Sequence, residues 1–168
     1  MISYKDLLNV LKNKDLDLIY PYPEKKEAGP QVLQIKYKSP VIGIEDSFLV
    51  VLVPPDVYEV VFNKKMNAYL VQFIYVVQQN IQDSLLEDVK TLLDALNKKI
   101  SIPGFGIDQA SKKVYYGYTQ IIASKKGLDV LPTTLDILIQ MMSLYTPAIM
   151  GVASGELPLS HLMPSSQI

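Results

Sequence analysis

The chain has 168 residues, of which 49% are hydrophobic and 20% are charged, and its formal net charge is −1. This length and composition are typical of a single globular domain that buries about two thirds of its unfolded surface. The near-balanced charge argues against a protein that binds nucleic acid by neutralising phosphates. All 16 basic residues are lysines, so no guanidinium is available for bidentate contacts to phosphate or guanine. We therefore expect no nucleic-acid partner.

Cysteine is absent, which excludes disulfides and thiolate metal sites. The N-terminal stretch MISYKDLLNVLK carries charges where a signal peptide needs an uninterrupted apolar run. The longest purely apolar run, Phe48 to Val53, is far shorter than a membrane span. We expect a soluble, cytoplasmic protein that has no membrane partner.

The first third of the sequence predicts one helix followed by strands. The apolar spacing predicts an amphipathic helix over Tyr4–Leu11, with Ser3 as its N-cap. Alternating patterns predict strands over Leu16–Tyr20 and Val32–Lys38. The next strand, Phe48–Val53, is apolar at every position, so both of its faces should be covered. After Pro54-Pro55-Asp56, residues Val57–Phe62 are expected to pair back on it as a further strand.

The middle of the chain predicts helix. Residues Met66–Asn80 are rich in β-branched and aromatic side chains, which favour a strand, but their apolar spacing is helical and continues into the next segment. We interpret this stretch as helical. The following segment carries a clear apolar stripe, opposed by Glu87, Lys90, Asp94 and Lys98; the stripe comprises Leu85, Leu86, Val89, Leu92, Leu93 and Leu96. The pattern Ser84-x-x-Glu87 predicts a capping box at its start.

A β-hairpin is predicted over Ile102–Ile122, between two helical segments. Phe105 and Ile107 alternate with polar or small residues, the stretch 110–113 is a polar turn, and alternation resumes from Val114 to Tyr118. A small-molecule pocket between this hairpin and the helices, around Phe105, Tyr116 and Tyr118, is one functional possibility. Packing of these aromatic side chains in the core is the other.

The last predicted helix, Leu135–Met150, is apolar on almost all sides. Pro132 and Asp136 suit its first turn, and Pro147 should kink or end it. Its apolar residues form two stripes. One comprises Leu135, Leu138, Met142 and Tyr145, and the other comprises Ile137, Met141, Leu144 and Ala148. One sheet face can cover only the first stripe. We expect the second to be covered by a second copy of the chain or by the tail from Leu157 to Met163.

These elements predict an α+β fold, in which an antiparallel sheet is packed by an N-terminal helix, a long central helix and a C-terminal helix. We expect one domain over residues 1–152 and a Pro- and Ser-rich tail over residues 153–168.

No group of residues predicts catalysis, a cofactor or a metal. His161 is the only histidine and has no specified orienting acid. Gly104-Phe105-Gly106 lacks the third glycine and the parallel βαβ context of a dinucleotide site, and more simply marks the entry to a strand. Asp83, Glu87 and Asp88 suit a helix start. The lysine pairs at 25–26, 64–65, 98–99, 112–113 and 125–126 suit the ends of elements.

The order of elements, together with LLEDVKTLLDALNKKISIPGFGIDQASKKVYYGY and GLDVLPTTLDIL, resembles the YbjN and type III secretion chaperone-like domains, in particular an archaeal branch of that group. The similarity extends over Tyr4–Met150. The resemblance implies a secretion-chaperone-like fold and a homodimer that holds an extended partner chain on apolar surface patches. It implies no enzymatic activity and provides no catalytic residues.

Three functional hypotheses follow, of which the third, a nucleic-acid accessory protein that uses gathered lysines, is disfavoured by the missing arginines. The first is a non-enzymatic binding module, a chaperone-like homodimeric adaptor that holds a partner protein on an apolar surface. Ile137, Met141, Leu144 and Ala148 are then the partner or dimer surface. The second is a protein that binds a small molecule or nucleotide in the pocket between the 102–122 hairpin and the helices.

Overall fold

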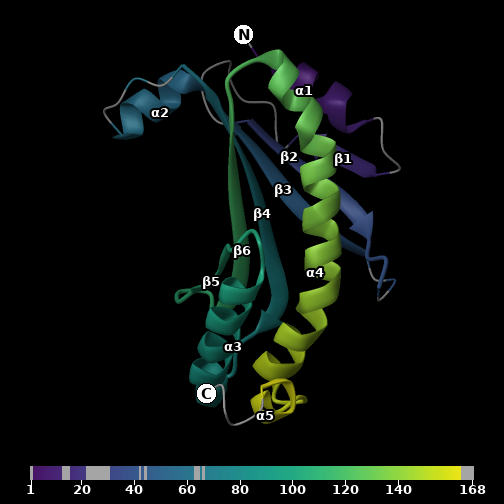
Figure 1. The fold of residues 1–168 in the computed structure, drawn as a ribbon, viewed down its shortest axis with the longest axis vertical. Coiled ribbons are helices and arrows are strands. Elements are labelled where there is room, and N and C mark those ends of the chain that lie inside the picture. Colours follow the sequence, from purple (N-terminus) through teal and green to yellow (C-terminus); the bar gives the residue numbers. More distant parts are fainter. Residues whose placement is uncertain are drawn as a thin grey trace. The chain divides into compact units, whose positions relative to one another are not determined.

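The computed structural model has an α+β fold (Figure 1). It describes residues 2–12, 16–21, 31–41, 43, 45–62, 65 and 67–163. The chain forms two compact units, each built from two separate segments. The first unit comprises Met1–Ile74 and Thr119–Gln140, and the second comprises Tyr75–Tyr118 and Met141–Ile168. The single α+β domain expected over residues 1–152 stays a prediction.

Six strands form one sheet in the order β1-β2-β3-β4-β6-β5. Their bounds are β1 Asp17–Pro21, β2 Gln31–Lys38, β3 Glu45–Val53, β4 Tyr69–Asn80, β5 Phe105–Asp108 and β6 Lys113–Ile122. The pairs β1–β2, β2–β3, β3–β4 and β5–β6 are antiparallel. The predicted fold class, an antiparallel sheet packed by N-terminal, central and C-terminal helices, is confirmed.

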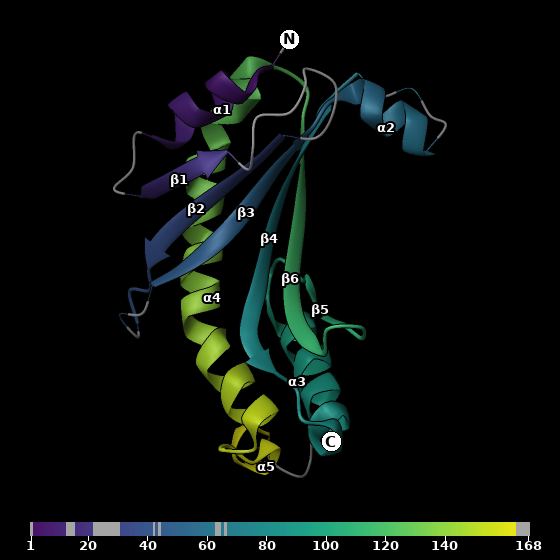
Figure 2. The same cartoon turned by 180° about the vertical axis from the view of Figure 1, so that it is seen from behind.

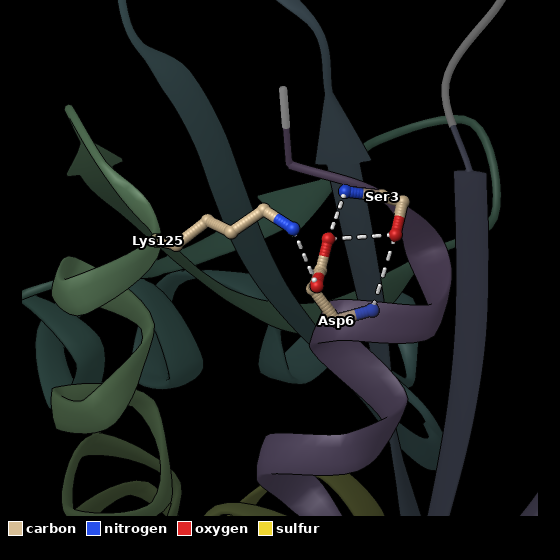
Figure 3. A network of polar contacts seen from close by, with 3 residues as sticks. All are labelled: Ser3, Asp6 and Lys125. Atoms are coloured by element: carbon tan, nitrogen blue, oxygen red, sulfur yellow. Dashed lines mark hydrogen bonds and ion pairs between the residues drawn. The ribbon is translucent and has the colours of Figure 1, made fainter.

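The helices are α1 Tyr4–Leu11, α2 Pro55–Phe62, α3 Leu86–Lys99, α4 Leu131–Ser154 and α5 Leu159–Leu162. Two short 3₁₀ segments, η1 Asp83–Leu85 and η2 Lys125–Val130, lead into α3 and α4. Helix α1 has the predicted bounds and the predicted N-cap. Ser3 forms a full capping box with Asp6, and Lys125 at the start of η2 donates a hydrogen bond to the same carboxylate (Figure 3).

In the first unit the core lies on one face of the sheet. Leu33, Ile35 and Tyr37 of β2 are buried, as predicted, and so are Phe48, Val50 and Leu52 of β3. The alternate residues of β3, Leu49, Val51 and Val53, are only half-buried. The second face of this strand is therefore covered only in part by the described chain. The part of α4 that belongs to this unit lies on one side of β2 and β3, and the view from behind shows those strands in front of it (Figures 1 and 2).

In two segments the observed secondary structure differs from the predicted one, because a predicted helix is a strand and a predicted strand is a helix. Residues Met66–Asn80 were predicted to be helical, but Tyr69–Asn80 is strand β4, in which Val71, Phe73, Tyr75 and Val77 are all buried. Buried residues therefore alternate along this segment as they do in a strand. Its β-branched and aromatic composition also favours a strand. Residues Val57–Phe62 were predicted to be a strand, but they belong to helix α2. Pro55 starts α2 and Asp56 lies in its first turn, which are favourable positions for both residues.

The second unit contains α3 and the hairpin. Val89, Leu92 and Leu93 of the predicted stripe are buried, whereas Leu85, Leu86 and Leu96 are half-buried. The capping box predicted at Ser84 does not form, because the chain enters α3 through η1 and Leu85 is the N-cap. Near the other end of α3, the Asn97 amide accepts hydrogen bonds from the N–H groups of Gly104 and Phe105 and donates one to the Phe105 carbonyl. This side chain attaches α3 to the predicted hairpin, which is confirmed.

Helix α4 is longer than predicted at both ends. It begins at Leu131 and continues past Pro147, which lies inside the helix and does not end it. The chain then turns at Gly155, whose positive φ of 80° suits glycine. Leu159 and Met163 of the following segment are buried, so the described part of the predicted tail is folded into the second unit.

Candidate functional site

The residues predicted as a partner or dimer surface lie on one face of α4. We call Ile137, Met141, Leu144 and Ala148 the α4 stripe. Leu144 is 60% exposed and Ile137 is 44% exposed, whereas Met141 and Ala148 are half-buried. The opposite stripe has the reverse environment, because Leu135, Leu138 and Met142 are fully buried and Tyr145 is half-buried. The structure therefore separates the two stripes as the spacing predicts.

A buried hydrogen bond helps to set the orientation of α4 in the second unit. The Thr146 hydroxyl donates to the hydroxyl of Tyr75 on β4, and both side chains are buried. Tyr145 also contacts Phe105 edge-to-face, with ring centroids 6.5 Å apart. These contacts direct one side of the helix inward, so Leu144 is directed toward solvent.

The exposed side of α4 is apolar over an unusually long distance. No charged residue occurs between Asp136 and Glu156. Three of its exposed large apolar residues, Val130, Ile137 and Leu144, recur every seven residues, and Val130 lies in the preceding η2 turn. A seven-residue repeat is the spacing at which one helix presents a continuous seam to another helix.

The tail does not cover this seam at Leu144. It packs elsewhere, because the Leu157 side chain lies against Gly151, where an added Cβ would approach Leu157 Cβ to 2.9 Å. Leu159 and Met163 are buried while Leu144 stays 60% exposed. The alternative that residues Leu157–Met163 fold over the α4 stripe is therefore wrong.

Two of the three hairpin aromatic residues are buried in the core of the second unit. Phe105 and Tyr116 are buried and pack edge-to-face at 5.1 Å between ring centroids. The Tyr116 hydroxyl donates a hydrogen bond to the Ile102 carbonyl, and burial of the ring, with a smaller contribution from Tyr118, raises the pKa of Tyr116 to about 12. Tyr118 is half-buried. These residues belong mainly to the core of the second unit.

A pocket nevertheless lies beside the same hairpin. It has a volume of about 320 Å³ and an apolar part formed by Ile81, Leu86 and Ile107. Its polar lining residues are Gln82, Asp83, Lys90, Gln109 and Lys112. Both lysines already have carboxylate partners, since Lys112 pairs with Asp83 and Lys90 pairs with Glu87. A larger pocket of about 480 Å³ lies between α3, the end of α4 and the start of α5.

The remaining sequence candidates have structural roles. His161 is an exposed residue of the short helix α5. Gly104 allows a close approach, because a Cβ there would lie 2.4 Å from the Gly117 carbonyl oxygen. Lys112 and Lys125 form ion pairs, and the pair at 25–26 and Lys64 fall outside the described residues. Within the described ranges, no three Asp, Glu or His side chains gather as a metal site would require.

By length and composition alone, one helical stretch of the described chain, Lys125–Ser154, is long and apolar enough to cross a membrane. In its most apolar window, 44% of the residues are buried inside the protein. The buried core helix of a soluble protein has the same composition, so this feature is weak evidence in either direction.

Comparison with known proteins adds no family to these observations. The sequence matches no family model, and no curated protein is significantly similar to it.

Proposed function

We propose that this protein is a non-enzymatic binding module, a chaperone-like homodimeric adaptor that holds a partner protein on apolar surface. The α4 stripe is the contact surface. The observation that carries the proposal is the 60% exposure of Leu144 on an uncharged helix face that the protein's own folded tail leaves open. The resemblance to secretion-chaperone domains supports the same proposal.

The chemistry of the α4 stripe favours a protein partner. Leu144, Ile137 and Ala148 offer apolar contacts without a hydrogen-bonding group, so they select for buried apolar area and not for a particular polar ligand. Met141 is an unbranched, polarizable side chain that adapts to contacts of different shape. Because Leu144 is 60% exposed, covering the rest of its side chain contributes about 1–2 kcal/mol, which corresponds to roughly fivefold to twentyfold in affinity.

The proposal is tested with the double variant Met141→Asp/Leu144→Asp. The wild-type protein is expected to suppress aggregation of a reduced, unfolding insulin B chain, and the double variant is expected to need at least about tenfold more protein for the same effect. Ala110→Asp is the control, because it adds a charge to an exposed position of the hairpin turn, away from the α4 stripe. A wild-type protein that leaves the aggregation unchanged contradicts the proposal.

A membrane-binding role is separated from this one by flotation with vesicles of mixed neutral and anionic lipids. The proposal expects the wild-type protein to stay with the soluble fraction. Flotation that Met141→Asp/Leu144→Asp abolishes and Ala110→Asp retains would assign the stripe to a lipid surface instead.

The pocket beside the hairpin supports a second candidate function, binding of a small molecule. Its apolar part and its two lysines suit a small amphiphile with an anionic head, which would have to compete with Asp83 for Lys112. Octanoate is a suitable probe. Methyl shifts of Ile81 and Ile107 on titration, which disappear in Lys112→Gln, would support this candidate over the first.

A further inference from the structure

The outer edge of β6 is only partly covered. The short strand β5 pairs with β6 from Asp108↔Lys113 to Phe105↔Tyr116, and one more hydrogen bond runs from the Gly117 N–H to the Gly104 carbonyl. Beyond that bond, no described strand lies on this side of residues Thr119–Ile122, since β5 is the last strand of the sheet. These four residues therefore form an open edge in the first unit.

The direction of the Gly117 N–H identifies the groups that this edge presents. Backbone groups of a strand alternate between its two sides, so those of Thr119 and Ile121 point to the same side as those of Gly117. The edge therefore carries two N–H donors and two carbonyl acceptors, from Thr119 and Ile121. A row of this kind is complementary to one type of occupant, a polypeptide in extended conformation.

The open edge lacks the charge and the proline that occur on the other edge strands of this sheet. Edge strands are often protected by charged residues or by proline. The opposite edge strand, β1, contains Asp17 and ends at Pro21, and β5 contains Gly106 and Asp108. The segment Thr119-Gln120-Ile121-Ile122 has no charge and no proline.

The side chains hold this segment extended and leave its outer face apolar. On the inner face Ile122 is buried, and Thr134 of α4 donates a hydrogen bond to the Gln120 side chain. On the other face Thr119 is exposed, and the Gln72 amide donates to its hydroxyl at 3.4 Å. Ile121 is 65% exposed, more than any other large apolar side chain of a described strand.

We infer that a second copy of this chain pairs with the open edge, so that residues Thr119–Ile122 of two protomers form an antiparallel ladder about a two-fold axis at Gln120. Thr119 then lies opposite Ile121 of the partner subunit, and Ile121 lies opposite Thr119 of the partner subunit. Both are outward-pointing positions, so the two pairs exchange four hydrogen bonds. Two β-branched side chains face each other in each pair, and no like charges meet.

This inference rests on the proposed function, because it assigns the homodimer to the β6 edge and leaves the α4 stripe to the partner protein. Pairing about a two-fold axis uses the open edge of both protomers, so no further chain can be added there. The edge can therefore lack charge and proline without causing the sheet to grow from chain to chain.

Analytical ultracentrifugation of four proteins tests the inference. Wild type is expected to be dimeric. Thr119→Lys/Ile121→Lys places like charges opposite each other and is expected to raise the dimer dissociation constant at least about tenfold. Tyr115→Lys is the matched control, since Tyr115 is an exposed β6 residue where β5 already covers the edge, and it should stay dimeric. Met141→Asp/Leu144→Asp should also stay dimeric.

Amide hydrogen exchange tests the same inference on the wild-type protein, so the result does not depend on whether a variant folds. The Thr119 and Ile121 amides should be protected at high concentration and lose protection on dilution, while the inward-pointing Gln120 amide stays protected at both. A dimer that Met141→Asp/Leu144→Asp dissociates and Thr119→Lys/Ile121→Lys does not would overturn the inference and keep the homodimer. A wild-type monomer would overturn the inference and the homodimer together. The insulin assay reads the function of the α4 stripe independently.

Discussion

At the scale of single residues, Asp6 combines a helix cap with a long-range ion pair. Its carboxylate accepts hydrogen bonds from the Ser3 N–H at 2.8 Å, from the Ser3 hydroxyl at 2.7 Å and from the Lys125 ammonium at 2.9 Å. These bonds favour the ionised form and hold the pKa of Asp6 far below its ordinary value of 3.8. One side chain thus caps α1 and connects it to η2, which lies more than a hundred residues later in the chain.

The lowered pKa predicts how the stability conferred by Asp6 depends on pH. A group whose pKa is depressed in the folded state stabilises the protein above its unfolded pKa, and this contribution is lost as the pH falls toward the folded pKa. The difference in unfolding free energy between wild type and Asp6→Asn should therefore be largest near pH 7 and shrink below about pH 4. Urea unfolding at a series of pH values measures it.

The control is Asp94→Asn, which changes an exposed carboxylate in the middle of α3 and should shift stability by no more than about 0.5 kcal/mol. A difference for Asp6→Asn that is constant from neutral to acid pH would mean that the network in Figure 3 does not persist in solution.

At the scale of elements, the β5–β6 pair depends on glycine at one position and not at another. A Cβ at Gly104 would lie 2.4 Å from the Gly117 carbonyl oxygen, which is backbone and cannot rotate away, whereas a Cβ at Gly117 would meet no atom within 4 Å. Gly104→Ala should therefore destabilise the protein by about 1–3 kcal/mol. Gly117→Ala should be neutral or stabilising by up to about 1 kcal/mol. Thermal melts of the two variants side by side check this, and equal losses would contradict it.

The elements also show where the sequence was informative. Helix α1, strand β2, helix α3 and the hairpin were predictable because each has one buried face and a clean period. Strand β4 was not, because Leu70, Phe73, Ile74 and Val77 fit a helical spacing while Val71, Phe73, Tyr75 and Val77 fit a period of two. Pairing with β3 decides between them, and that pairing is a long-range contact. The two α4 stripes were predictable for the same reason as α1, but their exposure was not, because it depends on where the tail packs.

At the scale of the whole molecule, charge makes the clearest prediction. The 16 basic residues are balanced by 17 acidic ones, and the lysines Lys90, Lys112 and Lys125 are engaged in ion pairs. We therefore expect no binding to duplex DNA tighter than the non-specific range of roughly 10⁻⁴–10⁻⁶ M at physiological salt. A gel-shift titration checks it, and a sub-micromolar complex at that salt would require a basic surface that the sequence does not indicate.

The division into two units was not predictable from the sequence, because no linker composition marks it. Strands β4 and β6 and helix α4 each run from one unit into the other, so the division follows from contacts between segments that are distant in sequence.

This arrangement has a consequence for the order in which the protein is made. The first unit requires residues Thr119–Gln140, so its folding must wait until the ribosome has synthesised all of Tyr75–Tyr118. At about 5–20 residues per second, this is a delay of seconds. During that interval the nascent chain contains β3 and the start of β4 but not the β6 segment that later pairs with β4. The edge of β4 that β6 later pairs with is therefore temporarily open, and it closes only once residues Thr119–Ile122 have been synthesised.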